Sequence, residues 1–258
     1  MVTLDVVRTR ALDSQEEATM PGIIGSLVLI ALIGYLWGSI PAGYWMGKLL
    51  RGKDFDIRNY GSHKTGMTNV LRTLGKGPAI IVGVIDISKG IGPALIATLV
   101  PFFYSAGWGP TVAAILAFLG HCFPVFIGFR GGRGVLTGGG ATLVLSPLIF
   151  LIGALTTIIT IATTRYVSLG SILGSAATTI SGLIFFFVGW IHLPQLVFFL
   201  TVPLAVIVIH YDNIGRLLAG TERKIGQKVV IPAETASSTK ETPKTAEEKH
   251  PTSTPKQA

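Results

Sequence analysis

The sequence is poor in charged residues and in cysteine. Only 13% of its 258 residues are Asp, Glu, Lys or Arg, whereas soluble domains carry roughly a quarter. This shortage, together with a mean hydropathy of +0.61, excludes an ordinary soluble domain and predicts a polytopic membrane protein. The single cysteine, Cys122, excludes an internal disulfide and a cysteine-rich zinc site. Because histidines and carboxylates do not stand at metal-ligand spacing, we expect no metal site and no cofactor.

Acidic residues are scarcer than basic ones, 13 against 21, and the net charge is +8. In a membrane protein such a charge is typical of cytoplasmic loops rich in Lys and Arg, and of attraction to anionic lipid head groups or substrates. We therefore expect contact with membrane lipid and no nucleic-acid partner.

Long apolar runs account for most of the chain. A membrane-spanning helix needs about 20 apolar residues, and six stretches qualify: residues 23–46, 78–103, 109–127, 147–164, 167–190 and 195–210. Basic residues follow the first, third, fourth and last of them, and the positive-inside rule places these loops in the cytoplasm. An even number of crossings must then join Arg130 to Arg165, and Ser146-Pro147 supplies a helix break between them. We predict a further short helix at 135–145, and thus an all-α bundle of about seven transmembrane helices.

This arrangement predicts an N-terminus outside and a C-terminus in the cytoplasm. Residues 1–22 begin with acidic side chains and lack a cleavage site, so they are expected to form a short extracytoplasmic tail before a retained span. From residue 231 the chain consists mainly of Thr, Ser, Pro, Lys and Glu, which predicts a disordered cytoplasmic tail. Residues 23–230 are predicted to form the one membrane domain.

Three polar, glycine-rich segments, residues 56–76, 120–140 and 209–226, lie on the predicted cytoplasmic side. Glycine turns let backbone N–H groups approach an anion, and a following helix N-terminus adds a positive dipole. The second segment places Arg130 and Arg133 before the predicted helix at 135–145, which favours a phosphate site. Glycine-rich loops also occur as tight turns or close helix contacts, and the Gly-Lys-Ser/Thr ending of a Walker A loop is missing.

Five titratable residues have two readings each. Asp86 and Lys89 share a helix face within the second span, either as a structural ion pair or as groups that shape a site. For His121 a hydrogen-bonded helix-end role is favoured, whereas His210 could equally accept a proton from an alcohol. Glu222 is expected to pair with a neighbouring arginine.

The three segments carry spaced motifs. GS-x-P followed by D-x-R-x-x-GSGN-x-GATN-x-x-R is matched by Gly38, Ser39, Pro41, Asp56, Arg58, Gly61, Ser62, Gly66, Thr68, Asn69 and Arg72. The element D-x-x-KG is matched by Asp86, Lys89 and Gly90. GH-x-x-P-x-x-x-x-F-x-GGKGVAT is matched by Gly120, His121, Pro124, Phe129, Gly131, Gly132, Gly134, Val135 and Thr137. H-x-x-NI-x-RL-x-x-G-x-E is matched by His210, Asn213, Ile214, Arg216, Leu217, Gly220 and Glu222.

These motifs resemble those of the PlsY family, the bacterial integral-membrane acyltransferases that use acyl-phosphate to acylate glycerol 3-phosphate. The resemblance implies a seven-span bundle in the bacterial plasma membrane with its site open to the cytoplasm. It implies acyl-phosphate and glycerol 3-phosphate as substrates, and lysophosphatidic acid and inorganic phosphate as products. It implies no acyl-carrier protein or coenzyme A at the site, and a functional link to the enzyme that makes acyl-phosphate.

The residues and the resemblance together predict three groups of site residues. The catalytic group is Ser62, Arg72, His210 and Asn213. The group that binds substrate or phosphate is Arg58, Lys64, Thr68, Asn69, Arg130, Gly131, Gly132, Arg133, Gly134 and Thr137. The structural or site-shaping group is Asp86, Lys89, His121, Arg216 and Glu222.

Five positions depart from the family pattern: His63, Lys64, Met67, Arg133 and Leu136. Arginine at 133 keeps the charge of the family's lysine and can hold phosphate with two hydrogen bonds, but residue 63 lacks the backbone freedom of the family's glycine. Two alternatives to the acyltransferase remain: a transporter or flippase of a phosphorylated lipid intermediate, whose basic loops and broken helices would look similar, and a degenerate, non-catalytic relative.

Overall fold

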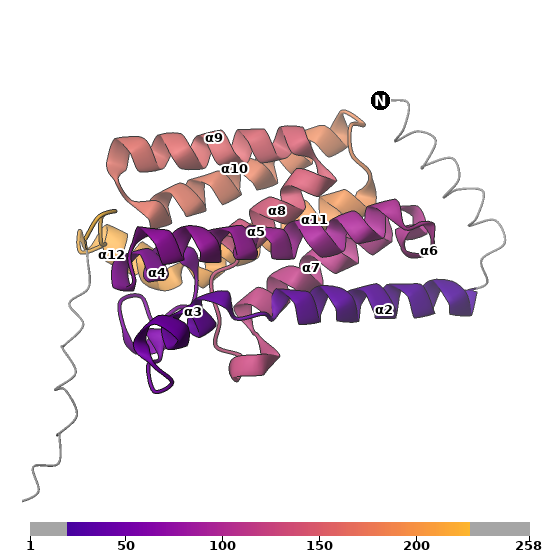
Figure 1. The fold of residues 1–258 in the computed structure, drawn as a ribbon. Coiled ribbons are helices and arrows are strands. Elements are labelled where there is room, and N and C mark those ends of the chain that lie inside the picture. The colour runs from indigo at the N-terminus through magenta and orange to yellow at the C-terminus, as the bar shows by residue number, and fades with distance from the viewer. Residues whose placement is uncertain (1–19, 228–258) are drawn as a thin grey trace, which may run out of the picture.

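The computed structural model describes residues 20–227, which form helices joined by turns (Figure 1). The elements are α2 (Met20–Gly38), α3 (Ala42–Arg51), η1 (Ile57–Asn59), α4 (Met67–Thr73), α5 (Lys76–Leu99), α6 (Pro101–Tyr104), η2 (Ser105–Gly107), α7 (Trp108–Cys122), η3 (Val125–Ile127), α8 (Val135–Leu145), α9 (Pro147–Thr164), α10 (Val167–Phe187), α11 (Leu193–Ile209) and α12 (Tyr211–Leu218). The predicted all-α class is confirmed. The tails predicted at 1–22 and 231–258 lie outside the described residues, except for residues 20–22, which begin α2.

Five helices of the described chain are long and apolar enough to cross a membrane, and a sixth is added if α11 and α12, which meet at 53°, count as one broken span. Helix α8 is a shorter apolar helix of 11 residues. Its bounds and those of α9 are the predicted ones, because Ser146 adopts an extended conformation before Pro147 and separates the two helices.

The remaining predicted bounds differ at prolines and glycines. The stretch 23–46 is not one helix, because the chain breaks at residues 39–41 before α3 begins after Pro41. The stretch 78–103 ends at Leu99, since Val100 is extended before Pro101. The stretch 109–127 ends as α7 at Cys122, two residues before Pro124. Helix α10 ends at Phe187, ahead of the left-handed Gly189, and α11 begins at Leu193 with a proline in its first turn.

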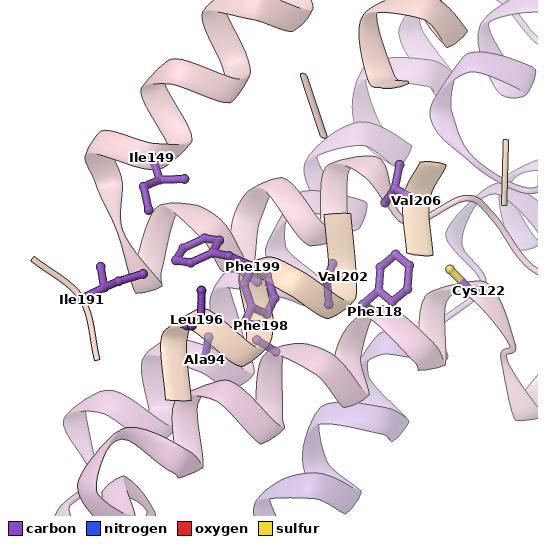
Figure 2. Packing of buried hydrophobic residues seen from close by; sticks show 12 residues of the cluster. Ala94, Phe118, Cys122, Ile149, Ile191, Leu196, Phe198, Phe199, Val202 and Val206 are labelled. Atoms are coloured by element: carbon purple, nitrogen blue, oxygen red, sulfur yellow. The ribbon is translucent and has the colours of Figure 1, made fainter. Parts of the chain in front are cut away.

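Small residues let the central helices approach closely. A Cβ atom added at Gly34 of α2 would lie 2.6 Å from the carbonyl oxygen of Ala113 in α7, and one at Gly38 would lie 2.1 Å from that of Ala117. A larger cluster of buried apolar side chains joins α7 to α5, α8, α9, α11 and the turn before α11 (Figure 2); it includes Phe118, Phe198, Phe199, Val202 and Val206.

The polar segments gather at one end of this bundle. Figure 1 shows α3, α4 and α12 together at the end where α5 begins, while α6 lies at the opposite end. The hairpin of α9 and α10 forms one side of the bundle, and most of α9 faces outward. The three segments predicted to share one side of the membrane therefore do share one end of the molecule.

Candidate active site

Three hollows that share lining residues lead from this end into the bundle. The polar vestibule has a volume of about 760 Å³ and is lined mainly by charged residues of the three polar segments. The central cavity, about 300 Å³, shares with the vestibule Ser62, Lys64, Arg72, Arg133 and Glu222. The apolar groove, about 250 Å³, lies between α8, α9, α10 and α11 and shares with the central cavity Val135, Leu136, Thr157 and Ser171. The path is therefore polar at one end and apolar at the other.

The first polar segment is organised by Asn69. Its Nδ2 donates to the backbone oxygens of Ile57, Tyr60 and Lys64, and its Oδ1 accepts from the N–H of Ser62 at 2.9 Å. The residue is 1% exposed. These loop bonds occupy the amide, so Asn69 shapes the loop whose Ser62 and Thr68 side chains line the central cavity. Its role in binding phosphate stays a prediction.

Arg58 also has a structural role. Its guanidinium forms a two-pronged pair with Asp56, with Nε–Oδ1 at 3.0 Å and Nη2–Oδ2 at 2.8 Å, and Nη1 donates to the oxygen of Ile127 at 2.7 Å. The guanidinium lies in the wall of the vestibule. Its donors are taken up by a carboxylate and a carbonyl, so it ties the first loop to the second. Its role in binding phosphate stays a prediction.

The glycines of the second segment allow close packing, and two of their backbone N–H groups are already hydrogen-bonded within the protein. The N–H groups of Gly131 and Gly132 donate to the oxygens of Cys122 and His121, both at 3.1 Å, so these two donors are already used within the protein. Phosphate binding by these glycines stays a prediction. A Cβ atom at Gly132 would lie 2.0 Å from His121 Nε2. Gly134 has φ +75° and lies against the Phe118 ring immediately before α8.

Thr137 does not reach the cavity. It is fully buried, and its hydroxyl donates to the oxygen of Asp86 at 2.9 Å. The hydroxyl thus ties α8 to α5, and the role of Thr137 in phosphate binding stays a prediction. The side chain of Arg133 lines both the vestibule and the central cavity, while Arg130 lies exposed at the edge of the vestibule.

A buried charged cluster lies beside the second glycine-rich loop. Lys89 Nζ lies 2.6 Å from Asp86 Oδ1, and His121 Nδ1 lies 3.5 Å from the same oxygen. All three residues are at most 6% exposed. Asp86 and His121 also line the central cavity. Both readings of the Asp86–Lys89 pair therefore hold, because the pair is neutralised in place and one member faces the site.

The third segment holds a hydrogen-bonded network around Glu222. Its Oε1 accepts from Asn213 Nδ2 and from Ser168 Oγ, both at 2.8 Å, and its Oε2 accepts from Arg216 Nε at 2.7 Å. The expected pairing with an arginine is thus present. Burial raises the pKa of the Glu222 carboxyl, but the hydrogen bonds from Arg216, Asn213 and Ser168 outweigh it and lower that pKa below its ordinary value.

His210 lies at the junction of α11 and α12 and lines the central cavity. Its Nδ1 lies 2.7 Å from the Val206 carbonyl oxygen. A carbonyl can only accept, so Nδ1 carries the proton in the neutral ring and Nε2 is the acceptor nitrogen. The helix-end reading of the sequence is therefore correct for Nδ1, while Nε2 has no protein partner within the described chain.

Several polar atoms around the cavity have no protein partner. Arg72 Nε, Arg133 Nε and Asn213 Oδ1 are buried without a hydrogen bond in the described part of the chain. Burial lowers the pKa of both guanidinium groups, yet an arginine remains charged in proteins. Two unpartnered cationic donors beside one unpartnered carbonyl acceptor indicate a site for a ligand that carries both an anion and a hydroxyl.

Comparisons with known proteins agree with this geometry. The family model named Glycerol-3-phosphate acyltransferase matches residues 28–220. A protein of that name from Shouchella clausii is 43% identical over 209 residues, covering 80% of this chain and 99% of the relative, and one from Symbiobacterium thermophilum is 41% identical over 207 residues, covering 80% and 98%. The chain belongs to the glycerol-3-phosphate acyltransferase family.

Solved structures of this acyltransferase family share the fold. The crystal structure of PlsY (YgiH), an integral membrane glycerol 3-phosphate acyltransferase, in its glycerol 3-phosphate form is 36% identical, with a TM-score of 0.69 over 78% of this chain and 96% of that one. Its lysophosphatidic acid form gives a TM-score of 0.67 over the same shares. The protein is thus a multi-pass integral membrane protein of the PlsY fold.

The departures from the acyltransferase motifs lie along the path itself. His63 is exposed in the vestibule with φ +56°, a left-handed conformation that glycine adopts freely, and its Nδ1 lies 2.8 Å from the oxygen of Arg58. That contact helps to hold the residue in its unusual conformation. Lys64 lines both polar hollows, and Leu136 and Met67 line the central cavity.

Sequence reasoning missed two residues near the site: Ser168 of the α9–α10 hairpin and Ile225 in the chain after α12. Ser168 bonds Glu222, and the segment 221–227 crosses to the hairpin, where the Ile225 N–H donates to the Arg165 oxygen at 2.8 Å. Ile225 also lines the central cavity. A lone serine in an apolar helix and a lone isoleucine in a tail give no signal that would distinguish them from their neighbours.

Proposed function

We propose that this protein transfers a fatty acyl group from acyl-phosphate to the 1-hydroxyl of glycerol 3-phosphate. The family assignment makes it a glycerol-3-phosphate acyltransferase that produces lysophosphatidic acid. Acyl-phosphate as the donor and inorganic phosphate as the second product are our proposal. The observation that carries it is a cavity whose polar end holds unpartnered cationic donors and whose other end opens into an apolar groove.

The charges of the vestibule suit two phosphates. Within residues 20–227, five of its cations have no carboxylate partner: Lys64, Arg72, Arg130, Arg133 and Arg223. Arg58 and Arg216 are neutralised by Asp56 and Glu222. The acyl-phosphate head and glycerol 3-phosphate are both anions that must occupy the site together. Cationic donors in a partly desolvated site bind such groups with short, charge-assisted hydrogen bonds.

The apolar groove suits the acyl chain. Glycines at 138, 139, 153 and 174 lie in its walls, and the rest of its lining is chiefly aliphatic, with the Phe150 ring and several Ser and Thr side chains. A fatty chain in this groove would bring its carbonyl carbon to the central cavity, beside the residues that the groove and the cavity share. The apolar contacts would anchor the donor, and roughly 25 cal/mol is gained for each Å² of apolar surface removed from water.

The transfer is proposed to be direct. The 1-hydroxyl oxygen attacks the acyl carbonyl carbon, the new ester bond forms, and the bond from that carbon to the phosphate oxygen breaks. Arg72 and Arg133 stabilise the charge that develops on the carbonyl and on the leaving phosphate. Ser62 contributes a hydrogen bond and not a nucleophile, since no imidazole or carboxylate of the described chain bonds its hydroxyl.

The hydroxyl proton is assigned to an oxygen of the leaving phosphate. His210 Nε2 is the competing acceptor, but burial and the nearby Arg133 both disfavour a positive charge on that ring. The phosphate gains negative charge as the bond breaks, so its basicity rises when a base is needed. A His210→Gln variant that kept more than a tenth of the turnover would support this assignment, and one reduced by about 10³, beyond the range of a lost hydrogen bond, would transfer the role to His210.

The seven-span topology is also proposed, with α8 as the seventh crossing in addition to the six longer spans. It gives an extracytoplasmic N-terminus, a cytoplasmic C-terminus, and an active site that faces the cytoplasm of a bacterial cell, where the basic segments belong. Residues 23–230 form the acyltransferase domain. Reporter fusions test this arrangement: a reporter fused after Ser146 should be active only outside the cytoplasm, and a cytoplasmic signal there would refute seven spans.

A reconstitution assay tests the reaction. Purified protein given acyl-phosphate and glycerol 3-phosphate should form lysophosphatidic acid and inorganic phosphate in equal amounts. Acyl-coenzyme A or acyl-carrier protein as the donor should give no product. Sealed vesicles with labelled acyl-phosphate distinguish the acyltransferase from the transporter alternative. A transporter would move the labelled donor across the membrane and form no new ester. A protein without turnover in both assays would be the degenerate relative, and reversion of His63 and Lys64 to Gly and Asn would show whether they cause the loss.

A further inference from the structure

The orientation of the Asn213 side chain is fixed by its partner. Glu222 is an ionised carboxylate and can only accept hydrogen bonds, so the amide nitrogen of Asn213 must face it, as the 2.8 Å contact from Nδ2 to Oε1 shows. The carbonyl oxygen, Oδ1, is therefore turned away from Glu222. This oxygen is buried without a hydrogen-bond partner in the described chain. The residue is 3% exposed and lines the central cavity.

Ser168 helps to hold this arrangement from across the cavity. Its hydroxyl, on the first turn of α10, donates to the same Oε1 that receives Asn213 Nδ2, also at 2.8 Å. Arg216 holds the other oxygen of the carboxylate at 2.7 Å. With three donors on two oxygens, the carboxylate has little freedom to rotate, and neither has the amide bonded to it.

An unpartnered carbonyl oxygen and an unpartnered cation bind different parts of the substrate. Phosphate oxygens of a dianion are acceptors and gain nothing from Oδ1, whereas Arg72 and Arg133 suit them. An alcohol can donate to Oδ1. An amide oxygen is too weak a base to take a proton from the hydroxyl that attacks the acyl carbon, so it suits a hydroxyl that keeps its proton throughout the reaction.

We propose that Asn213 Oδ1 accepts a hydrogen bond from the non-reacting 2-hydroxyl of glycerol 3-phosphate, and that Ser168 is a positioning residue that, through Glu222, aims this acceptor. The inference rests on the proposed function, because it takes glycerol 3-phosphate as the acceptor substrate. Ser168 lies in none of the glycine-rich segments, and it connects the α9–α10 hairpin to the selection of the acceptor.

The test compares two acceptor substrates, glycerol 3-phosphate and propane-1,3-diol monophosphate, which lacks only the 2-hydroxyl. The wild type should prefer glycerol 3-phosphate by about tenfold or more in kcat/KM, the value of one well-made hydrogen bond in a buried site. Ser168→Ala and Asn213→Ala should reduce this preference to about twofold or less, because the acceptor is misaligned or gone. If the analogue is not acylated, its competitive inhibition constant replaces its turnover.

Two variants separate positioning from general damage. Ser168→Thr keeps the hydroxyl and should keep the preference. Thr163→Ala removes an exposed hydroxyl of α9, which donates to the oxygen of Ile159 in its own helix and lines none of the three hollows, and should also keep the preference. If Ser168→Ala does not fold, Ser168→Cys tests the same change with a weak donor of similar shape.

Two results would overturn the proposal. Ser168→Ala could slow both acceptors by the same factor, which would be a structural effect only, or it could leave the preference at its wild-type value. Neither outcome resembles failure of the proposed function, in which the wild-type protein itself would form no lysophosphatidic acid from glycerol 3-phosphate.

Discussion

Replacement of Gly132 by alanine tests whether the second glycine loop holds the reacting groups in place. The added Cβ would lie 2.0 Å from His121 Nε2, and real contacts of this kind are essentially never shorter than 3.0 Å. The ring or the loop must therefore move by at least 1.0 Å, the difference between these two distances. The ring is 6% exposed and lies beside Asp86, so it has little room to withdraw.

We expect the loop to move and the rate to fall. A displacement of about 1 Å in a positioning element costs on the order of 10²-fold in rate, and overpacking of this kind destabilises a fold by about 1–3 kcal/mol. Phosphate release at varied glycerol 3-phosphate would give kcat/KM, and thermal unfolding in detergent would give the change in stability.

Two further variants control this experiment. Gly77→Ala places a methyl group where nothing lies within 4 Å, and it should leave both kcat/KM and the thermal unfolding temperature near their wild-type values. His121→Ala combined with Gly132→Ala makes room for the new methyl group, so the pair should be less destabilised than the sum of the single variants. Wild-type kcat/KM in Gly132→Ala would refute the reasoning that the geometry of this loop controls the reaction.

Three other outcomes follow from the site. Arg133→Ala should lower kcat/KM by about 10²–10³, while Arg133→Lys, which restores the family residue, should stay within tenfold of wild type in the same assay; equal losses would contradict a role for charge. Asp86→Asn should destabilise the protein by about 3–5 kcal/mol because it leaves the Lys89 charge buried and unpaired, and Asp86→Asn with Lys89→Met should recover much of the melting temperature; no recovery would show that the charge is not the cause. The pKa of Glu222 is lowered on folding, so its contribution to the stability of the fold is fully present above the unfolded pKa of about 4.5 and is lost as pH falls through the folded pKa. On acidification below pH 4.5, the melting temperature of Glu222→Gln should therefore change less than that of wild type. Parallel curves of melting temperature against pH would refute the linkage.

Much of the helix pattern could be predicted from composition and from proline. Ser146-Pro147 gave both bounds of the break between α8 and α9, because a residue before proline avoids the helical region whatever surrounds it. The end of α5 at Leu99 obeys the same rule at Val100, yet hydropathy alone extended that span to residue 103. Apolar side chains continue past a break, so hydropathy does not detect a helix end.

The site could be predicted as a region but not residue by residue. Matching a motif does not distinguish a side chain that binds substrate from one that builds the loop. The hydrogen bonds of Asn69, Arg58 and Thr137 to neighbouring backbone oxygens could not be read from the motifs. Ser168 could not be found from sequence, since its partner is 54 residues away and only the folded hairpin brings the two together.

The continuity of the three hollows has a consequence for how the two products leave. Lysophosphatidic acid is a long molecule with one charged end, and inorganic phosphate is a small ion. A path that is polar at the vestibule and apolar at the groove between α8, α9, α10 and α11 would give each product of the proposed reaction an exit of its own polarity. The lipid would then leave along the apolar side while the ion leaves through the polar side, so neither departure would have to wait for the other.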